Sequence, residues 1–159
     1  MTETPEVEQN PIVRKLRAGD PHAVAEARVF RGELTVVVPR EQLRHAAEFL
    51  RGDPELQFVF LSDITATDRF PIEPRFAVNY HLVSLERRER LRLKVRVSGD
   101  TPVVDSVTAV WPTADWHERE IFDLFGVRFE GHPDLRRLLM PDDWEGYPLR
   151  KDYPVEGYR

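Results

Sequence analysis

The stretch that decides the fold is FAVNYHLVSLERRERLRLKVRV, residues 76–97, because it carries two patterns of alternating apolar residues. Successive side chains of a strand point to opposite faces, so these patterns predict strands over 76–85 and 91–97, each with one buried face. The charged residues 86–90 between them lack the Gly or Asn of a tight turn, but they fit an exposed hairpin tip. The stretch therefore predicts a pair of antiparallel strands.

Upstream of this pair, helical and extended patterns alternate. Asn10-Pro11 is a helix-start signal, and Gly19 marks the end of that helix. A helix from Glu41 to Gly52 is predicted because four apolar residues recur at the spacing of one helix face. These residues are Leu43, Ala46, Ala47 and Leu50. The remaining upstream predictions are a flexible tail over 1–9, a short helix over 24–28, a strand over 34–38, and a strand over 58–61 covered on both faces.

Downstream of the pair, helical and irregular signals dominate. Residues 103–110 could form a strand or a helix, and the spacing of their apolar residues favours the helix. Asp115 followed three residues later by Glu118 is a capping-box pattern, which predicts a helix over 116–125 that ends at a left-handed Gly126. Several Pro residues keep the chain beyond Gly131 out of regular structure, so we expect an ordered strap against a surface.

Together these elements predict an α+β fold. We expect a two-layer domain with a mainly antiparallel sheet and packed helices, followed by an irregular Pro-rich C-terminal strap. The expected division is a flexible N-terminal tail over 1–9, an α+β domain over 10–130 and a C-terminal docking segment over 131–159.

Composition excludes several classes of function. The chain has 159 residues, a net charge of -5 and no Cys. An acidic balance disfavours general nucleic-acid binding, and no apolar run approaches the roughly 20 residues of a membrane-spanning helix. Without Cys the chain has no disulfide, no thiol nucleophile and no Cys-ligated zinc or iron–sulfur cluster.

The chemistry of the chain is concentrated between Trp111 and Tyr153. All three Trp residues lie in this stretch, interleaved with many Arg, Asp and Glu residues. Aromatic anchors mixed with arginine are typical of protein interfaces. The stretch therefore predicts a docking surface rather than an active site.

Within the predicted helix, Glu118 borders the apolar face, where a carboxylate needs a partner. Two interpretations stay open, namely an ion pair with a nearby arginine or a cap on its own helix. The candidate arginines are Arg128, Arg136, Arg137 and Arg150. On the opposite side of the helix, Arg119 and Asp123 have the i,i+4 spacing of an ion pair.

The sequence contains no recognised catalytic, nucleotide-binding or metal-binding motif. His81, His117 and His132 lack the i,i+4 spacing of helical metal sites such as H-E-x-x-H, even with Glu118 and Glu120 beside them, so we expect structural or surface roles. No nucleotide-binding glycine loop and no G-x-S-x-G elbow is present.

The strand over 91–97 carries a basic face made of Arg92, Lys94 and Arg96. Its simplest interpretation is a solvated strand face, with a docking role as the alternative.

Three blocks in the C-terminal part resemble a known family. They read WHEREIFDLFG at 116–126, FEGHPDLRRLL at 129–139 and DDWEGYPLRKDYP at 142–154. They look like the signature of the C subunit of bacterial NADH-quinone oxidoreductase, the counterpart of the 30-kilodalton subunit of mitochondrial complex I. Upstream, FVFLSDITATD at 58–68 and RFAVNYHLVS at 75–84 are similar to the family's central strands.

The resemblance implies a non-catalytic structural and assembly subunit in the hydrophilic arm of the proton-translocating enzyme. Electron transfer from NADH to quinone would belong to the whole complex, with flavin and iron–sulfur clusters in partner subunits and no cofactor in this one. The expected partners are the large quinone-site subunit and the iron–sulfur subunits, and no nucleic acid. The expected location is peripheral, on the cytoplasmic side of the bacterial inner (cell) membrane. The alternative is the equivalent subunit of a membrane-bound hydrogenase or of an oxidoreductase with another electron donor.

No catalytic, cofactor-binding or metal-binding residue is predicted. The expected partner interface combines the capped helix, the Gly-His-Pro turn and the strap. Its residues are Trp116, Glu118, Arg119, Glu120, Asp123, His132, Arg136, Arg150, Lys151, Asp152 and Tyr153.

Overall fold

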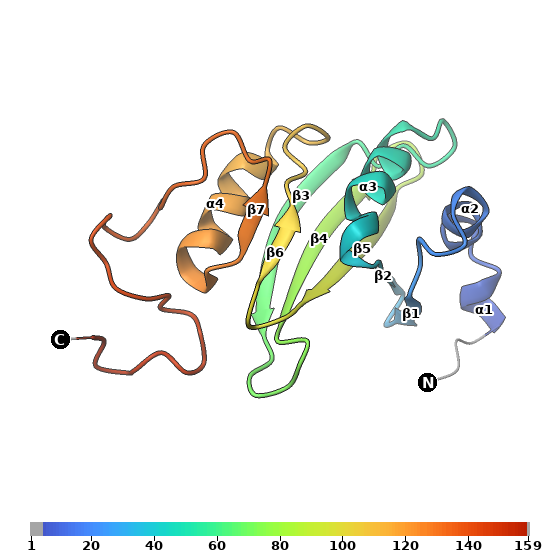
Figure 1. The fold of residues 1–159 in the computed structure, drawn as a ribbon. Coiled ribbons are helices and arrows are strands. Elements are labelled where there is room, and N and C mark those ends of the chain that lie inside the picture. The colour runs from blue at the N-terminus through green and yellow to red at the C-terminus, as the bar shows by residue number, and fades with distance from the viewer. Residues whose placement is uncertain (1–4, 159) are drawn as a thin grey trace.

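The structure is a computed structural model that describes residues 5–158, and its central element is a five-stranded sheet in the order β1-β2-β5-β4-β3 (Figure 1). All neighbouring strands pair antiparallel except β2 and β5, which are parallel. The mainly antiparallel α+β fold predicted from the sequence is therefore confirmed. The strands are β1 Glu26–Phe30, β2 Glu33–Val37, β3 Phe60–Asp68, β4 Phe76–Ser84 and β5 Glu89–Val97.

The core lies against one face of this sheet. Apolar residues of β4 and β5 sit directly opposite each other, for example Tyr80 opposite Leu93, and both are fully buried. Helix α3 (Leu43–Gly52) follows a 3-10 turn, η1 (Arg40–Gln42), and lies in front of the sheet in Figure 1. Its four predicted apolar positions are all buried. The alternating apolar residues of the strands and the apolar face of the helix thus pack together in one hydrophobic core.

The N-terminal residues pack more closely than predicted. Helix α2 (Pro11–Gly19) begins as expected, with the Asn10 side chain accepting a hydrogen bond of 2.9 Å from the amide of Ile12. Instead of a flexible tail, Pro5–Glu8 form helix α1, and Val7 is 1% exposed within the core. The first part of the predicted tail, residues 1–4, lies outside the described residues.

The short helix predicted over 24–28 is wrong, because β1 forms there. A two-residue turn at Arg31 (φ 52°) and Gly32 (φ 79°) joins β1 to β2 in an antiparallel hairpin. Two central residues with positive φ match the twist of paired strands. Pairing along β2 therefore overrides the weak helical signal of this short segment.

The prediction of a strand covered on both faces over 58–61 is also wrong in part. The strand β3 begins at Phe60 and runs to Asp68 as an edge of the sheet. Phe58 and Leu61 are buried, but Val59 and Phe60 are each 48% exposed. A strand at the edge of a sheet leaves some of its apolar side chains exposed to solvent, and a continuous run of apolar residues in the sequence does not show this.

The helix favoured over 103–110 is wrong as well, and the alternative of a strand is correct for the start of this segment. Val103–Asp105 form strand β6, which pairs in parallel with β7 (Arg128–Glu130), and the amide of Ser106 donates to the carbonyl of Glu130 at 2.7 Å. The partner strand comes only after the next helix, so local spacing gives no sign of it.

Helix α4 (Ala114–Phe125) packs against β3 and ends at a left-handed Gly126 (φ 73°), as predicted. It begins two residues earlier than expected, after Thr113, and no side chain caps it. The predicted Asp115 cap is therefore wrong. Beyond β7, residues 131–158 contain no helix or strand and run past α4 as an irregular strap (Figure 1). The division of the chain at residues 130 and 131 stays a prediction.

Candidate docking surface

Glu118 is completely buried, and it neither pairs with an arginine nor caps its own helix. Its carboxylate accepts hydrogen bonds from the Ser106 hydroxyl and the Val107 amide, both at 2.7 Å. Burial raises the pKa of Glu118 to about 7, although these two donors act in the opposite direction. Glu118 therefore joins α4 to the end of β6 and has no surface of its own.

Replacing Glu118 with Gln should flatten the pH dependence of stability. The pKa of this acid is about 7 in the fold against 4.5 when unperturbed, so the free energy of unfolding falls as pH rises from 4.5 through 7. The loss is at most about 3 kcal/mol. Gln keeps an oxygen for the Val107 amide and an NH₂ for Ser106, so at pH 8 the variant should melt at or above the wild-type temperature.

Thermal melting between pH 5 and 8 checks this expectation, with Glu120→Gln on the same helix as the matched control. A pH slope identical to wild type in Glu118→Gln would show that Glu118 does not titrate in this range.

Asp123 is the second buried carboxylate of α4, and it binds the strap rather than Arg119. One oxygen accepts from three successive backbone amides of the strap, and the other accepts from the Arg137 guanidinium at 3.1 Å. The three amides belong to Leu138 (3.1 Å), Leu139 (2.7 Å) and Met140 (2.9 Å). The predicted i,i+4 pair of Arg119 and Asp123 is therefore wrong.

Arg119 also holds the strap by its backbone. Its guanidinium donates to the carbonyls of Arg136 and Arg137 at 3.2 Å each, and it lies over the Trp116 ring at 5.0 Å. His132 has a similar part, because its side chain is fully buried and its Nε2 contacts the backbone carbonyl of Asp115 at 3.1 Å. Both residues fix the Gly-His-Pro turn and its continuation to α4.

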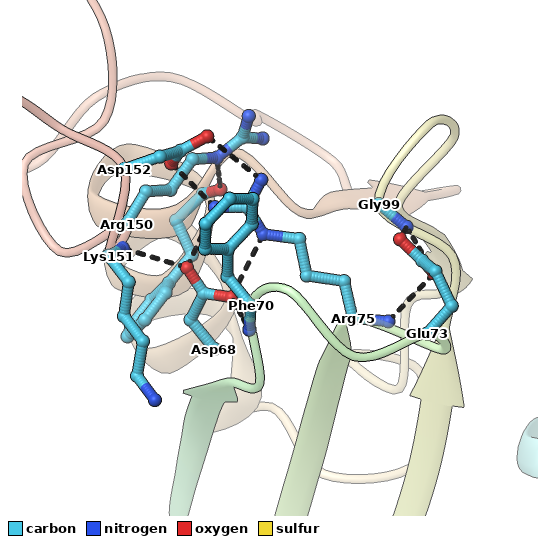
Figure 2. A network of polar contacts seen from close by, with 9 residues as sticks. Asp68, Phe70, Glu73, Arg75, Gly99, Arg150, Lys151 and Asp152 are labelled. Atoms are coloured by element: carbon cyan, nitrogen blue, oxygen red, sulfur yellow. Dashed lines mark hydrogen bonds and ion pairs between the residues drawn. The ribbon is translucent and has the colours of Figure 1, made fainter.

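A third buried carboxylate, Asp68 at the end of β3, fixes the far end of the strap. We call Asp68, Arg75 and Asp152 the Arg75 cluster, and Figure 2 shows the Arg75 guanidinium between the two carboxylates. Arg75 binds Asp68 with two bonds of 2.9 and 2.8 Å, and it binds Asp152 with two more of 3.1 and 2.6 Å. The Lys151 amide also donates to Asp68, at 2.8 Å.

The electrostatics of the Arg75 cluster favour a charged Asp68. Burial alone would raise the pKa of Asp68, but hydrogen bonds from Arg75, Lys151 and Phe70 outweigh it and hold the pKa at about 2. The hydrogen bonds of Arg75 to Asp68 and to Asp152 raise the pKa of Arg75, so the pair of Asp68 and Arg75 stays ionised.

Between these anchors, Arg150 lies against the end of α4. Its Nε donates to the carbonyl of Phe125 at 2.6 Å, and its guanidinium stacks on Tyr147 at 4.7 Å. A Cβ at Gly126 would come within 2.6 Å of both the Arg150 and the Tyr147 side chains. Only glycine fits here, because φ is positive and the strap passes this close.

The structure divides the predicted interface residues into internal and exposed groups. Glu118, Arg119, Asp123 and the His132 side chain are buried, whereas Glu120, Arg150 and Tyr153 are partly buried. The exposed members are Trp116, Arg136, Lys151 and Asp152. Whether these residues meet a partner stays a prediction.

Of the three Trp residues, only two can serve such a surface. Trp111 is 2% exposed, and its indole N–H donates to the carbonyl of Phe58 at 3.0 Å in the core. Trp116 is 60% exposed and Trp144 is 39% exposed.

Sequence reasoning missed two groups of residues. Asp68, Arg75 and Ser106 hold the surface from within, and no local signal marks them because their partners lie 7 to 83 residues away, in other elements. The other missed residues are large apolar side chains of the strap that are exposed to solvent. They are Leu139, Leu149, Val155 and Tyr158. The sequence signal that could have indicated them is their place in a Pro-rich segment, which cannot bury its side chains in regular structure.

The histidines do not gather into a metal site in the part of the chain that the structure describes, since no three potential ligands lie together there. His117 lies 3.2 Å from Asp63, and His81 lies 3.3 Å from the Thr65 hydroxyl. Between residues 5 and 158, no helix has both the length and the apolar character that crossing a bilayer requires.

Comparison with known proteins places these features in a family. Residues 36–159 match the family described as "Respiratory-chain NADH dehydrogenase, 30 Kd subunit". The NADH-quinone oxidoreductase C subunit of Roseiflexus sp. (strain RS-1) is 51% identical over 91% of this chain and 83% of that protein. The corresponding C subunit of Geotalea uraniireducens (strain Rf4) is 45% identical over 94% of this chain and 90% of that protein.

Solved structures agree with the fold. The trypsin-resistant fragment of Nqo5 has a TM-score of 0.67 and 35% identity, and the match covers 78% of this chain and 96% of the fragment. A chain of the membrane-bound sulfane sulfur reductase, an archaeal respiratory membrane complex, has a TM-score of 0.74 and 30% identity, with 91% and 84% covered. The family match spans most of the sheet, α4 and the strap, and we conclude that this chain belongs to the family of the 30 Kd subunit of respiratory-chain NADH dehydrogenase.

Proposed function

We propose that this chain is a structural and assembly subunit of the hydrophilic arm of proton-translocating NADH-quinone oxidoreductase. It holds no cofactor of its own and supports electron transfer from NADH to quinone by the whole complex, whose flavin and iron–sulfur clusters lie in other subunits. Its position is peripheral, on the cytoplasmic side of the bacterial cell membrane.

The observation that carries this proposal is the way the strap is held. Asp123, Arg119 and Asp68 bind the strap mainly by its backbone, so its aromatic and apolar side chains are left on the surface. A catalytic site would instead aim titratable groups into a cleft. A fixed backbone that presents large side chains is what a docking surface needs.

The proposed partners are the large quinone-site subunit and the iron–sulfur subunits of the same arm. Direct contact is proposed for the exposed residues Trp116, Arg136, Lys151 and Asp152, together with the exposed apolar side chains of the strap. Glu118 and Asp123 are buried beneath this surface and hold it in position.

Co-purification from host membranes tests the function. The tagged wild-type chain should bring down the flavin- and cluster-bearing subunits of an NADH-oxidising complex. A chain that is recovered without them would refute the proposal.

The double variant Trp116→Ala/Leu149→Ala should lower the recovery of those subunits at least tenfold, because truncating an interface anchor costs about 1.4 kcal/mol or more. The two side chains are 60% and 52% exposed, so the melting temperature of the isolated chain should hardly change. Leu85→Ala, at a site 66% exposed on the β4–β5 hairpin, is the matched control. Unchanged recovery in the double variant would remove these residues from the interface.

A second candidate is the equivalent subunit of a related respiratory complex with another electron donor. The likeness to a chain of the sulfane sulfur reductase complex favours it, but the identity is 30%, against 45% and 51% for the two NADH-quinone oxidoreductase relatives. Assaying the purified assembly with NADH, hydrogen and reduced ferredoxin as donors distinguishes the two.

A further inference from the structure

The face of the sheet opposite the core carries a row of cations on its middle strand. Alternate residues of β5 point away from the core, and β5 is the third of the five strands, so Lys94 lies near the centre of this face. The outward-facing residues of β5 are Arg90, Arg92, Lys94 and Arg96. We call this surface the open face.

Most of the countercharge on the open face is already used. Arg92 pairs with Glu33 at 2.5 Å, and Arg96 pairs with Glu26 at 3.0 Å. Lys94 lies between these two arginines on the same strand. Among residues 5–158 its ammonium group has no hydrogen bond and no carboxylate within ion-pair distance.

Lys94 is also partly removed from water. Its neighbours across the sheet are Val37 and Asn79, which are 5% and 7% exposed. Burial, and after it the nearby charges of Arg28, Arg96 and Arg92, lower the pKa of Lys94, although the Glu26 carboxylate acts in the opposite direction. A cation that is partly buried among like charges is unfavourable unless a carboxylate is supplied from outside.

We propose that the open face binds an acidic segment of a neighbouring subunit, with one carboxylate seated on Lys94 between Arg92 and Arg96. The inference rests on the proposed function, because the neighbour belongs to the same assembly. Charge complementarity selects a protein over an anionic lipid surface. Glu26 and Glu33 flank the cation and would repel a uniform layer of phosphates, whereas a single carboxylate fits between them.

Zero-length crosslinking tests this contact directly, because a carbodiimide joins a lysine amine only to a carboxylate that touches it. The chain has three lysines, Lys15, Lys94 and Lys151. Lys15 lies 2.9 Å from both Asp53 and Glu55 and should give crosslinks within the chain as an internal control. In the intact complex, peptide mapping should find Lys94 joined to an Asp or Glu of another subunit.

Crosslinks at Lys15 without any at Lys94 would overturn the inference. If Lys151 were crosslinked to a neighbour in the same sample, the proposed function would survive that result. A chain that migrates alone in gel filtration of the solubilised membranes would refute the proposed function as well.

Charge reversal separates docking from folding. Lys94→Glu places an acid among Arg28, Arg92 and Arg96, so the isolated chain should melt at or above the wild-type temperature. Its recovery in the complex should nevertheless fall at least tenfold, while Lys94→Arg keeps the cation and should be recovered normally. Arg14→Glu, an exposed charge reversal on α2, is the control and should leave recovery unchanged.

Normal recovery of Lys94→Glu would overturn the inference. So would binding of the wild-type chain to vesicles rich in phosphatidylglycerol that Lys94→Glu abolishes, because the open face would then be a lipid-binding surface.

Discussion

Replacing Asp123 with Ala should detach the strap from α4 while the sheet stays folded. The variant leaves three consecutive amides without their acceptor and Arg137 without its carboxylate. Each lost partner of a buried donor costs about 1–3 kcal/mol, and breaking a buried ion pair costs about 3–5 kcal/mol. The strap has no helix or strand of its own to resist this loss, so local opening should come before global unfolding.

Hydrogen exchange measures this opening. We expect the amides of Leu139 and Met140 to exchange at least a hundredfold faster in Asp123→Ala, which corresponds to about 2.7 kcal/mol. The amides of β4 and β5 should change much less. Asp143→Ala, at an exposed position of the same strap, is the matched control. Equal protection of Leu139 in Asp123→Ala and wild type would mean that the carboxylate does not hold the strap.

Replacing Arg75 with Ala should destabilise the whole chain and shift its acid unfolding. Asp68, whose side chain is 2% exposed, would lose both of its bonds to the guanidinium. We expect a loss of about 3–5 kcal/mol in the free energy of unfolding at pH 7. In wild type the lowered pKa of Asp68 contributes about 2 kcal/mol above pH 4, and this stability disappears as pH falls from 3.8 through 2. In Arg75→Ala the pKa of Asp68 should rise because burial is no longer offset by the guanidinium, so this loss of stability in acid should become smaller.

Urea unfolding at several pH values checks both parts of this expectation. Arg75→Lys keeps the charge but cannot bind two carboxylates with paired bonds, so its stability should fall between those of Arg75→Ala and wild type. Arg128→Ala removes an exposed arginine from β7 and is the control. A stability in Arg75→Ala within about 1 kcal/mol of wild type would show that the cluster behaves as a surface salt bridge.

Elements with a strong period could be predicted from the sequence. The alternation in β4 and β5 and the 3.6-residue spacing in α3 report the burial of their own side chains. The glycine that ends α4 reports the left-handed backbone conformation of its own position. The errors at β1 and β6 have the opposite origin. Both are short strands whose conformation depends on a partner strand, and in β6 the partner lies beyond an entire helix.

The contacts within the candidate site could not be predicted from the sequence. Aromatic and charged residues mark Trp111–Tyr153 as a dense region of the sequence, yet Trp111 belongs to the core. The partners of Glu118 lie 11 and 12 residues upstream, and the Lys151 amide meets Asp68 across 83 residues. Sequence spacing within one helix cannot indicate contacts of that kind.

The use of backbone amides as the strap's attachment points affects how its sequence can change. Asp123 and Asp68 recognise N–H groups that every residue except proline possesses. The path of the strap is therefore encoded largely outside the strap, in two aspartates of the folded body. Its exposed apolar side chains, such as Leu139 and Leu149, are free to diverge and adapt to a changing neighbour, so long as proline does not replace Leu138, Leu139, Met140 or Lys151 and remove one of these amides.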